Sequence, residues 1–420
     1  MSEYIICGGN ALNGTVAVSG SKNAALPILC ATLLCSDGTV TLNNCPDITD
    51  VHYTLNILSC FGCETEFVNG TVTVNAQNAK FCKLPFELTS KMRSASLFLG
   101  ASLGRFNKAT SCRSGGCELG QRPIDMHLKG FEKMGVSVSE AGDCIMISGT
   151  PHGTDVFLRY PSVGATENVM LAAVLAKGTT TITNAAREPE IVDLQNFLNA
   201  MGAKIHGAGG STVIIEGIEK LNGIVYNIMG DRIEAATYLA GAIATDGCVT
   251  VTGIDPNCLT AVTDVIINSG GCVCRRPNSI TVRRGGQFVL SPTRIETAPY
   301  PGFPTDAQSV FMAMLLKSQG ITEICERVFS DRLRVVSEFL KMGAVISVSG
   351  DTAQVCGAET LYGACLFAGD LRSGAALVIA ALSAVGESTV KNIAHIERGY
   401  QNFESKLCSL GANIKKINGD

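Results

Sequence analysis

An internal repeat of roughly 70 residues constrains the fold of this chain more than any other feature of its sequence. Its clearest mark is a glycine that ends an amphipathic segment and precedes a strand-like stretch. This glycine usually follows Leu, Met or Phe, and its copies are Gly62, Gly135, Gly202, Gly270, Gly343 and Gly411. Because the period is longer than one solenoid turn, each copy is expected to be a complete supersecondary unit.

A second mark lies roughly 24 residues before each of these glycines, where an apolar, Ala-rich segment stops and an alternating strand begins. The apolar segments are residues 25–34, 169–176, 235–244, 310–316 and 375–384, with an irregular copy at 94–103. They are apolar on almost every side, which predicts buried helices. The second segment of each unit, such as 193–201 or 332–342, predicts an amphipathic helix that covers a sheet.

Six such units predict two α/β domains of three units each, with the apolar helices inside and the sheets outside. The alternative is a generic α/β sandwich in which the glycines recur by chance. The near-constant period argues against that alternative.

Composition excludes several classes of protein. Lys and Arg number 33 against 37 Asp and Glu, and the net charge is −4, so nucleic acid is not expected as a partner. No apolar run reaches the roughly 18 residues that a transmembrane helix needs, so no membrane association is expected. Residues 1–4 lack the basic and apolar regions of a secretion signal, which favours a cytoplasmic protein with reduced thiols.

Most of the 18 cysteines are therefore interpreted as small hydrophobic residues, such as Cys30 within an apolar run. Two close pairs stand out, Cys60 with Cys63 and Cys272 with Cys274. Because neither has a second pair of matching spacing and a nearby His, no metal site is predicted.

Two polar segments interrupt the repeat in the first half of the chain, each at the start of an apolar helix. Residues 19–25 place Lys22 there, and helix N–H groups with a cation form an anion site, although Gly-Ser-Lys is also common in turns. Residues 161–168 either bind a phosphate or cap the helix, and the sequence leaves both interpretations open.

A third polar segment, residues 114–127, surrounds Cys117 with glycines and places Arg122 nearby. This pattern is typical of a mobile, exposed loop, where a thiol is either reactive or simply tolerated. The arginine favours the reactive interpretation because a cation lowers the pKa of a thiol.

Acid–arginine groupings are spread through the C-terminal half, at 331–332, 370–372 and 397–398, together with Asp306 in the segment 303–306. Individually each is a typical surface ion pair of small energetic value. Collectively they would form a ring of arginines for a substrate bearing carboxylate and phosphate, with Asp306 as a base.

These segments resemble the UDP-N-acetylglucosamine 1-carboxyvinyltransferases, a family of enolpyruvyl transferases, over essentially the whole chain. The motifs that carry the resemblance are 20–27 (GSKNAALP), 115–117 (GGC), 122–125 (RPID), 162–166 (SVGAT), 184–190 (NAAREPE), 303–306 (FPTD) and 398–400 (RGY). The resemblance implies two inside-out α/β barrel domains, each of three repeated βαβαββ-type units with buried helices. Residues 22–229 would form the domain that carries the cysteine loop, and 1–21 with 230–420 the second domain. The active site would lie in the cleft between them.

The resemblance also implies the reaction. The enolpyruvyl group of phosphoenolpyruvate would pass to the 3'-hydroxyl of UDP-N-acetylglucosamine by addition and elimination, releasing phosphate, as the first committed step of peptidoglycan synthesis. No metal or organic cofactor is implied. Fosfomycin, an epoxide that mimics the donor, would alkylate Cys117.

Residue roles follow from the matching motifs. Lys22 and Arg122 would hold the phosphate, and Arg398 with Arg372 the carboxylate, while Asn23 would contact the reacting groups. Asp306 would accept the hydroxyl proton. Cys117 would protonate the methylene carbon or form a covalent adduct, and both roles stay open. The remaining substrate-binding residues would be Arg93, Pro123, Ile124, Asp125, Met126, Ser162, Val163, Gly164, Val328 and Arg332.

Two positions depart from the family pattern. Tyr160 stands where some members have a lysine near the nucleotide phosphates, and Arg159 is a candidate substitute. Ser114 replaces a proline, which would loosen the loop. The rival functions are 5-enolpyruvylshikimate-3-phosphate synthase, which has the same fold but no cysteine in this loop, and a catalytically silent paralogue that binds without turnover. Nothing in the sequence predicts an oligomeric state.

Overall fold

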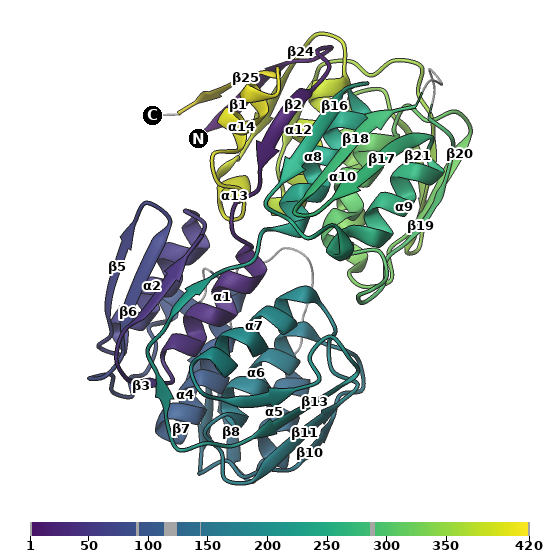
Figure 1. Ribbon diagram of the computed structural model, residues 1–420. Helices are drawn as coiled ribbons and strands as arrows, with labels where there is room; N and C mark the ends of the chain where they lie inside the picture. Colours follow the sequence, from purple (N-terminus) through teal and green to yellow (C-terminus); the bar gives the residue numbers. More distant parts are fainter. Residues whose placement is uncertain (1, 90–91, 113–123, 143, 286–289, 419–420) are drawn as a thin grey trace. The chain divides into compact units, whose positions relative to one another are not determined.

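The computed structural model describes residues 2–89, 92–112, 124–142, 144–285 and 290–418, and Figure 1 shows its helices and strands. Chain contacts divide these residues into two compact units. The N-terminal unit contains the described part of 20–229, and the C-terminal unit combines 2–19 with the described part of 230–418. Each unit has its own hydrophobic core.

The C-terminal unit contains three four-stranded sheets of one design, in which the first strand runs parallel to the second and the other neighbours are antiparallel. In spatial order, the strands are β2 (Asn13–Ala17), β16 (Cys248–Thr252), β18 (Ser279–Arg284), β17 (Gly271–Arg276); β19 (Arg294–Glu296), β20 (Ile321–Cys325), β22 (Thr352–Cys356), β21 (Val345–Ser349); and β23 (Cys365–Phe367), β24 (Glu387–Lys391), β1 (Glu3–Cys7), β25 (Asn413–Ile417). The N-terminal strands β1 and β2 thus complete two different sheets of this unit.

Helices of the C-terminal unit fall into an inner and an outer set. The inner helices are α8 (Arg232–Ala244), α10 (Thr305–Leu315) and α12 (Leu371–Ser383). The outer helical segments are η2 (Pro256–Leu259), α9 (Thr260–Asn268), η3 (Ser330–Val335), α11 (Val336–Lys341), α13 (Ala394–Glu397) and α14 (Phe403–Ser409). The inner helices pack against one another, and every residue of α8 is buried.

The N-terminal unit repeats this design with one reduced sheet. Its strands, in spatial order, are β15 (Val225–Asn227), β4 (Val40–Asn43), β6 (Thr71–Asn75), β5 (Glu64–Val68); β10 (Asp155–Phe157), β11 (Thr179–Thr183), β13 (Thr212–Glu216), β12 (Lys204–His206); β7 (Lys108–Cys112), β9 (Cys144–Ser148), β8 (Ser137–Ala141); and the small pair β14 (Leu221–Asn222), β3 (Cys35–Asp37). Its inner helices are α1 (Lys22–Thr32), α4 (Phe98–Phe106) and α6 (Val163–Ala173), and its other helical segments are α2 (Thr49–Cys60), α3 (Phe86–Thr89), η1 (Arg93–Leu97), α5 (Asp125–Lys133) and α7 (Pro189–Ala200).

The α/β fold class, with repeated units around buried helices, is confirmed. Within the described ranges, however, the sheets of each unit stay separate and do not close into a barrel. The glycines that mark the repeat all have φ between +83° and +109°, so each ends its helix in the left-handed conformation that favours glycine.

Two details differ from the sequence expectation. Except for α4, which begins at Phe98 inside its apolar run, the inner helices begin several residues before the apolar runs, and polar caps such as Ser21 and Asp370 start some of them. The cysteines are also less uniform than expected. The buried ones are Cys30, Cys35, Cys45, Cys63 and Cys325, whereas Cys60, Cys248, Cys272, Cys274, Cys365 and Cys408 are exposed. Several exposed thiols alternate with buried residues along a strand, which places them on its outer face.

Within the described ranges, no helix combines the length and apolar character needed to cross a bilayer. The same residues contain no group of three His, Cys, Asp or Glu side chains arranged to hold a metal ion.

Candidate functional site

A carboxylate held by two buried arginines lies at the start of α10 in the C-terminal unit. Arg372 Nη2 donates to Asp306 Oδ2 at 2.9 Å, and Arg332 Nη2 donates to Oδ1 of the same carboxylate. The arginine side chains are only 3% and 5% exposed, whereas that of Asp306 is 25% exposed. The fold therefore brings together three of the residues that the sequence singled out.

Arg332 retains unused hydrogen-bonding capacity beside this carboxylate. Its Nε donates to Thr305 Oγ1 at 3.0 Å, and its guanidinium lies 5.6 Å from the ring centre of Phe329. Its Nη1 is buried and has no hydrogen-bond partner among the residues that the structure describes. A buried guanidinium with an unsatisfied N–H is suited to an anionic oxygen.

Glu326 supports this cluster, and sequence analysis missed it. Its carboxylate accepts hydrogen bonds from Thr297 Oγ1 at 2.8 Å and from Thr305 Oγ1 at 3.0 Å. It also accepts from the backbone N–H groups of Val328 and Phe329, at 2.8 and 2.9 Å. Glu326 thereby fixes the turn that contains Val328, and its only sequence signal is an acid directly after an alternating strand.

The first turn of α12 positions Arg372. Asp370 caps this helix and accepts from the backbone N–H of Arg372 at 2.8 Å. The guanidinium lies 5.9 Å from the ring centre of Tyr400. Burial is the largest single effect and opposes the charge of Arg372, but the attractions of Asp306, Tyr400 and Asp231 together outweigh it and raise the pKa of Arg372 above its ordinary value. Arg372 therefore stays charged. Arg398 ends the short helix α13 and is half-buried.

The N-terminal ends of the inner helices meet near this guanidinium. Asp231 caps α8, Asp306 lies in the first turn of α10, and the charges of both act on Arg372 at the start of α12. Helix N-termini present unpaired N–H groups and a positive dipole end. This end of the C-terminal unit therefore favours anions.

In the N-terminal unit, Lys22 is the first residue of α1, and Asn23 follows it, half-buried. Lys22 Nζ lies 2.7 Å from Oδ2 of Asp50 in the first turn of α2. Their side chains are 11% and 3% exposed. Asp50 was not predicted, because a single acid at the start of a helix resembles an ordinary dipole partner.

His127 on α5 is a buried, uncharged histidine beside the start of α6. Its Nδ1 accepts from Asn168 Nδ2 at 2.9 Å, since the amide Oδ1 of Asn168 already accepts from Gly100 N–H at 2.7 Å. Burial, and then the Arg93 cation at the start of η1, lower the pKa of His127 to about 4, against a smaller opposing effect of Asp125. With Nδ1 accepting, Nε2 bears the proton.

The start of α6 shows helix capping at one of the expected substrate segments. Ser162 Oγ accepts from Ala165 N–H at 3.3 Å, and Val163 and Gly164 form the first turn. A Cβ on Gly164 would lie 3.1 Å from the His127 ring. Glycine therefore allows the histidine to approach, and anion binding at this turn would depend on backbone N–H groups.

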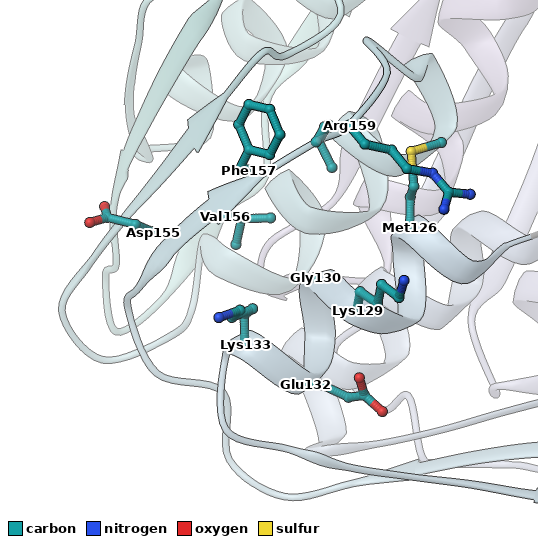
Figure 2. A pocket seen from close by; sticks show the side chains of 10 residues that line it. Met126, Lys129, Gly130, Glu132, Lys133, Asp155, Val156, Phe157 and Arg159 are labelled. Carbon is teal, nitrogen blue, oxygen red and sulfur yellow. The ribbon is translucent and has the colours of Figure 1, made fainter.

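A pocket of about 570 Å³ lies between α5 and the segment around β10. Figure 2 shows Met126 and Arg159 close together on one side of it, with Asp155 on the far side. Arg159 Nη2 lies 2.6 Å from Asp125 Oδ2. Ile124 caps α5 and is half-buried, and Tyr160 is 39% exposed.

Cys117, Arg122 and Pro123, with Ser114, lie outside the described residues, so their predicted roles stay predictions. Of the other predicted residues, the structure groups Asp306, Arg332 and Arg372 in the C-terminal unit. In the N-terminal unit it places Lys22, Arg93 and Ser162 at the starts of α1, η1 and α6.

Comparison with known proteins gives a consistent set of relatives. A family model described as EPSP synthase (3-phosphoshikimate 1-carboxyvinyltransferase) matches residues 6–407. UDP-N-acetylglucosamine 1-carboxyvinyltransferase 2 of Carboxydothermus hydrogenoformans is 46% identical over 99% of this chain and 100% of its own. UDP-N-acetylglucosamine 1-carboxyvinyltransferase of Hydrogenovibrio crunogenus is 43% identical over the full length of both chains.

Solved structures agree with the fold. The enolpyruvyl transferase NikO from Streptomyces tendae superposes with a TM-score of 0.89 at 26% identity, over 100% of this chain and 99% of that one. EPSP synthase from Acinetobacter baumannii superposes with a TM-score of 0.76 at 20% identity over both full chains, which supports the fold alone.

Proposed function

The chain belongs to the EPSP synthase (3-phosphoshikimate 1-carboxyvinyltransferase) family, and we propose that it transfers the enolpyruvyl group of phosphoenolpyruvate to UDP-N-acetylglucosamine. Phosphate leaves, and the product opens peptidoglycan synthesis. The relatives named UDP-N-acetylglucosamine 1-carboxyvinyltransferase are 42–46% identical to this chain over nearly its whole length. Both substrates are small anionic molecules, and we assign the reaction to the cytoplasm.

The observation that carries the proposal is Asp306 between two buried arginines, one of which has an unused N–H. Phosphoenolpyruvate brings a carboxylate and a phosphate, about three negative charges, into one site. Preorganised guanidinium groups stabilise such charge without reorganisation during the reaction. In our proposal, Arg372 and Arg398 hold the carboxylate, and Lys22 with Arg122 holds the phosphate.

Asp306 can accept a proton without losing its arginine contacts. Each of its carboxylate oxygens accepts one hydrogen bond from an arginine and keeps a second lone pair for the proton of the 3'-hydroxyl. An arriving donor anion would compete for Arg332 and Arg372, and loss of either contact would make Asp306 a stronger base. Binding of phosphoenolpyruvate would thus activate the base.

Cys117 and Asn23 complete the proposed chemistry. Protonation of the methylene carbon of an enol ether creates an oxocarbenium-like centre, so a positioned acid accelerates it. We assign this proton to Cys117, either directly or through a covalent adduct, and the contact with the reacting groups to Asn23. Elimination then removes phosphate from the tetrahedral intermediate and a proton from its methyl carbon, which returns to the group that supplied it, and the new carbon–carbon double bond is that of the enol ether product.

The sugar nucleotide would bind through residues of both units. The proposed set is Arg93, Arg122, Pro123, Ile124, Asp125, Met126, Ser162, Val163, Gly164, Asp306, Val328 and Arg332. Because these residues belong to different units, we expect the units to close when UDP-N-acetylglucosamine binds. Small-angle scattering that shows no compaction with the sugar nucleotide would contradict this expectation.

Phosphate release measures the proposed activity directly. We expect release when phosphoenolpyruvate and UDP-N-acetylglucosamine are both present, one equivalent per enolpyruvyl product seen by mass spectrometry, and none with either alone. Shikimate 3-phosphate replaces the sugar nucleotide in a parallel reaction and tests the shikimate pathway rival. Binding of UDP-N-acetylglucosamine without phosphate release would instead indicate a silent paralogue.

Fosfomycin tests the thiol. We expect one covalent addition, mapped by peptide mass spectrometry to Cys117, and no addition in Cys117→Ser. The exposed Cys272 provides an internal control, because it lies on the outer strand β17 and should stay unmodified. Addition at several thiols or at none would exclude a selectively reactive Cys117.

A further inference from the structure

Tyr400 is a buried tyrosine beside Arg372, and the proposed function gives it no part. It follows the short helix α13, and its backbone N–H donates to the carbonyl of Ile396 at 3.0 Å. Only 3% of the residue is exposed. A buried hydroxyl without a hydrogen bond costs free energy, because it has lost its contacts with water. The partners of this hydroxyl therefore indicate what the residue does.

Thr237 of α8 is one of these partners. Its Oγ1 lies 2.8 Å from the Tyr400 hydroxyl oxygen, and the distance alone does not say which oxygen donates. Thr237 Oγ1 also donates to the backbone carbonyl of Ile233 at 2.9 Å. A threonine hydroxyl has a single proton, so this carbonyl already takes it. Tyr400 is therefore the donor to Thr237, and the lone pairs of the tyrosine oxygen stay available.

Arg372 is the donor that uses these lone pairs. Its guanidinium lies 5.9 Å from the centre of the Tyr400 ring, and it makes a side-chain hydrogen bond to the tyrosine. Burial raises the pKa of Tyr400 above its ordinary value, although the charge of Arg372 and both hydrogen bonds act in the opposite direction. The hydroxyl therefore stays protonated, so it can donate to Thr237 and accept from Arg372 at the same time.

We propose that Tyr400 is a positioning residue that orients Arg372 for the carboxylate of phosphoenolpyruvate. The inference rests on the proposed function, in which Arg372 helps to hold this carboxylate. A guanidinium is a planar fork of N–H groups, and Asp306 fixes it at Nη2. A second contact, with Tyr400, limits rotation about the first. The remaining N–H groups are then oriented before the substrate arrives, which lowers the entropy cost of binding.

Tyr400→Phe removes the hydroxyl and keeps the ring. The ring can still pack on Phe403, whose ring centre is 4.6 Å away, and against the guanidinium. Because a hydrogen bond to a charged group is lost, the KM for phosphoenolpyruvate should rise about tenfold. The carboxylate keeps its charge throughout the reaction, so kcat should stay within about twofold of the wild-type value. The KM for UDP-N-acetylglucosamine should not change.

Two inhibitors separate this role from a general loss of structure. Phosphoglycolate has a carboxylate and a phosphate, whereas inorganic phosphate has no carboxylate. In Tyr400→Phe, inhibition by phosphoglycolate should weaken about tenfold, and inhibition by inorganic phosphate should stay the same. The matched control is Tyr238→Phe, because Tyr238 of α8 is also buried and its hydroxyl donates to Glu234 at 3.0 Å. This control should keep the wild-type KM for phosphoenolpyruvate.

A double-mutant cycle tests the contribution of Thr237. Thr237→Val removes the acceptor of the Tyr400 proton, so the KM for phosphoenolpyruvate should rise as it does in Tyr400→Phe. Thr237→Ser keeps a hydroxyl and should retain the wild-type KM. In the Tyr400→Phe background, Thr237→Val should add no further increase, because the two residues act through one hydroxyl.

The outcomes distinguish this inference from the proposed function. A wild type that releases no phosphate would overturn the proposed function and the inference with it. An active wild type with an unchanged KM for phosphoenolpyruvate in Tyr400→Phe would overturn the inference alone. Equal changes in Tyr400→Phe and Tyr238→Phe, or equal weakening of both inhibitors, would also overturn it, because such changes indicate a structural role only.

Discussion

The C-terminal unit presents an acid between two arginines at its inner helix ends, whereas the N-terminal unit presents a lysine–aspartate pair and an uncharged histidine. Both units use the same repeat, and in both most of the candidate residues lie at helix starts. The comparison teaches that the repeat determines where functional side chains are placed. The residues at those positions determine the chemistry.

The largest effect on activity is expected when the charge of Asp306, which pairs with Arg332 and Arg372, is removed. Asp306→Asn removes the proposed base while keeping the shape of the side chain, so kcat should fall by about 10²–10⁴-fold with UDP-N-acetylglucosamine binding largely kept. Steady-state kinetics and calorimetric titration measure the two quantities. The control is Asp351→Asn, which breaks an exposed ion pair with Arg327 in the same unit and should leave kcat unchanged. Unchanged turnover in Asp306→Asn would remove this residue from the base role.

The ion pair between Lys22 and Asp50 in the N-terminal unit should contribute mainly to the stability of the folded protein. Asp50→Asn removes the carboxylate that pairs with Lys22, so the free energy of unfolding should fall by about 1–3 kcal/mol. Urea denaturation measures the loss of unfolding free energy, and hydrogen exchange shows which of the two units is destabilised. Inorganic phosphate should restore part of the stability if Lys22 binds phosphate.

An exposed pair of the same unit supplies the control for that loss. Lys220 Nζ lies 3.2 Å from Asp37 Oδ2, and both side chains are at least 60% exposed. Asp37→Asn should therefore cost less than about 1 kcal/mol. Equal losses in the two variants would mean that burial does not distinguish the Lys22 pair.

His127 should give the N-terminal unit a dependence on pH. The pKa of His127 is about 4 in the folded protein, below its usual 6.5, so between these values only the unfolded chain binds the proton. The free energy of unfolding should therefore fall as the pH drops from 6.5 towards 4, by roughly 3 kcal/mol in all. Above pH 6.5 this contribution is complete.

The histidine contribution is the difference between the wild type and His127→Gln across that range, because other groups titrate in both proteins. Glu167, for example, has a pKa raised by burial and by neighbouring acids, which acts in the opposite direction. Parallel curves for wild type and His127→Gln would show that the buried histidine does not couple to folding.

The smallest loss of stability is expected for two equivalent asparagines, one in each unit, and it should be equal in the two units. Asn184 and Asn392 both have positive φ directly after a repeat strand, and their side-chain amides donate to Leu158 and Ala368 carbonyls at 2.7 and 3.0 Å. Glycine at either position keeps the conformation and loses the hydrogen bond, so each substitution should cost about 1 kcal/mol. Chemical denaturation measures both, and clearly unequal costs would break the equivalence of the units.

Sequence patterns predicted much of this fold. The glycine period and the apolar helices led to three repeats in each half, and the structure has them. Most helix starts were placed too late, because hydrophobicity marks the buried part of a helix and not its polar cap. The assignment of residues 1–21 to the second domain came from family resemblance, because the sequence of a strand does not specify which other strand it pairs with.

The candidate site could be predicted in part. Asp306, Arg332 and Arg372 stood out as acid–arginine groupings, but the sequence did not show that both arginines share one carboxylate. Asp50 and Glu326 were missed, because each becomes informative only through what it contacts. Their partners are distant or lie across a turn, and sequence spacing does not encode such contacts.

By itself, the sequence determined the repeat, the buried helices and the residue types at the helix starts, because periodic hydrophobicity and helix-ending glycines are local properties. Only the tertiary structure decided which strand completes which sheet and which charges pair. Strand β2 pairs with β16, which lies more than half of the chain away in sequence. Asp306 at the start of α10 pairs with Arg372 at the start of α12 in the same unit. Such pairings depend on the simultaneous burial of many side chains, and no local pattern specifies them.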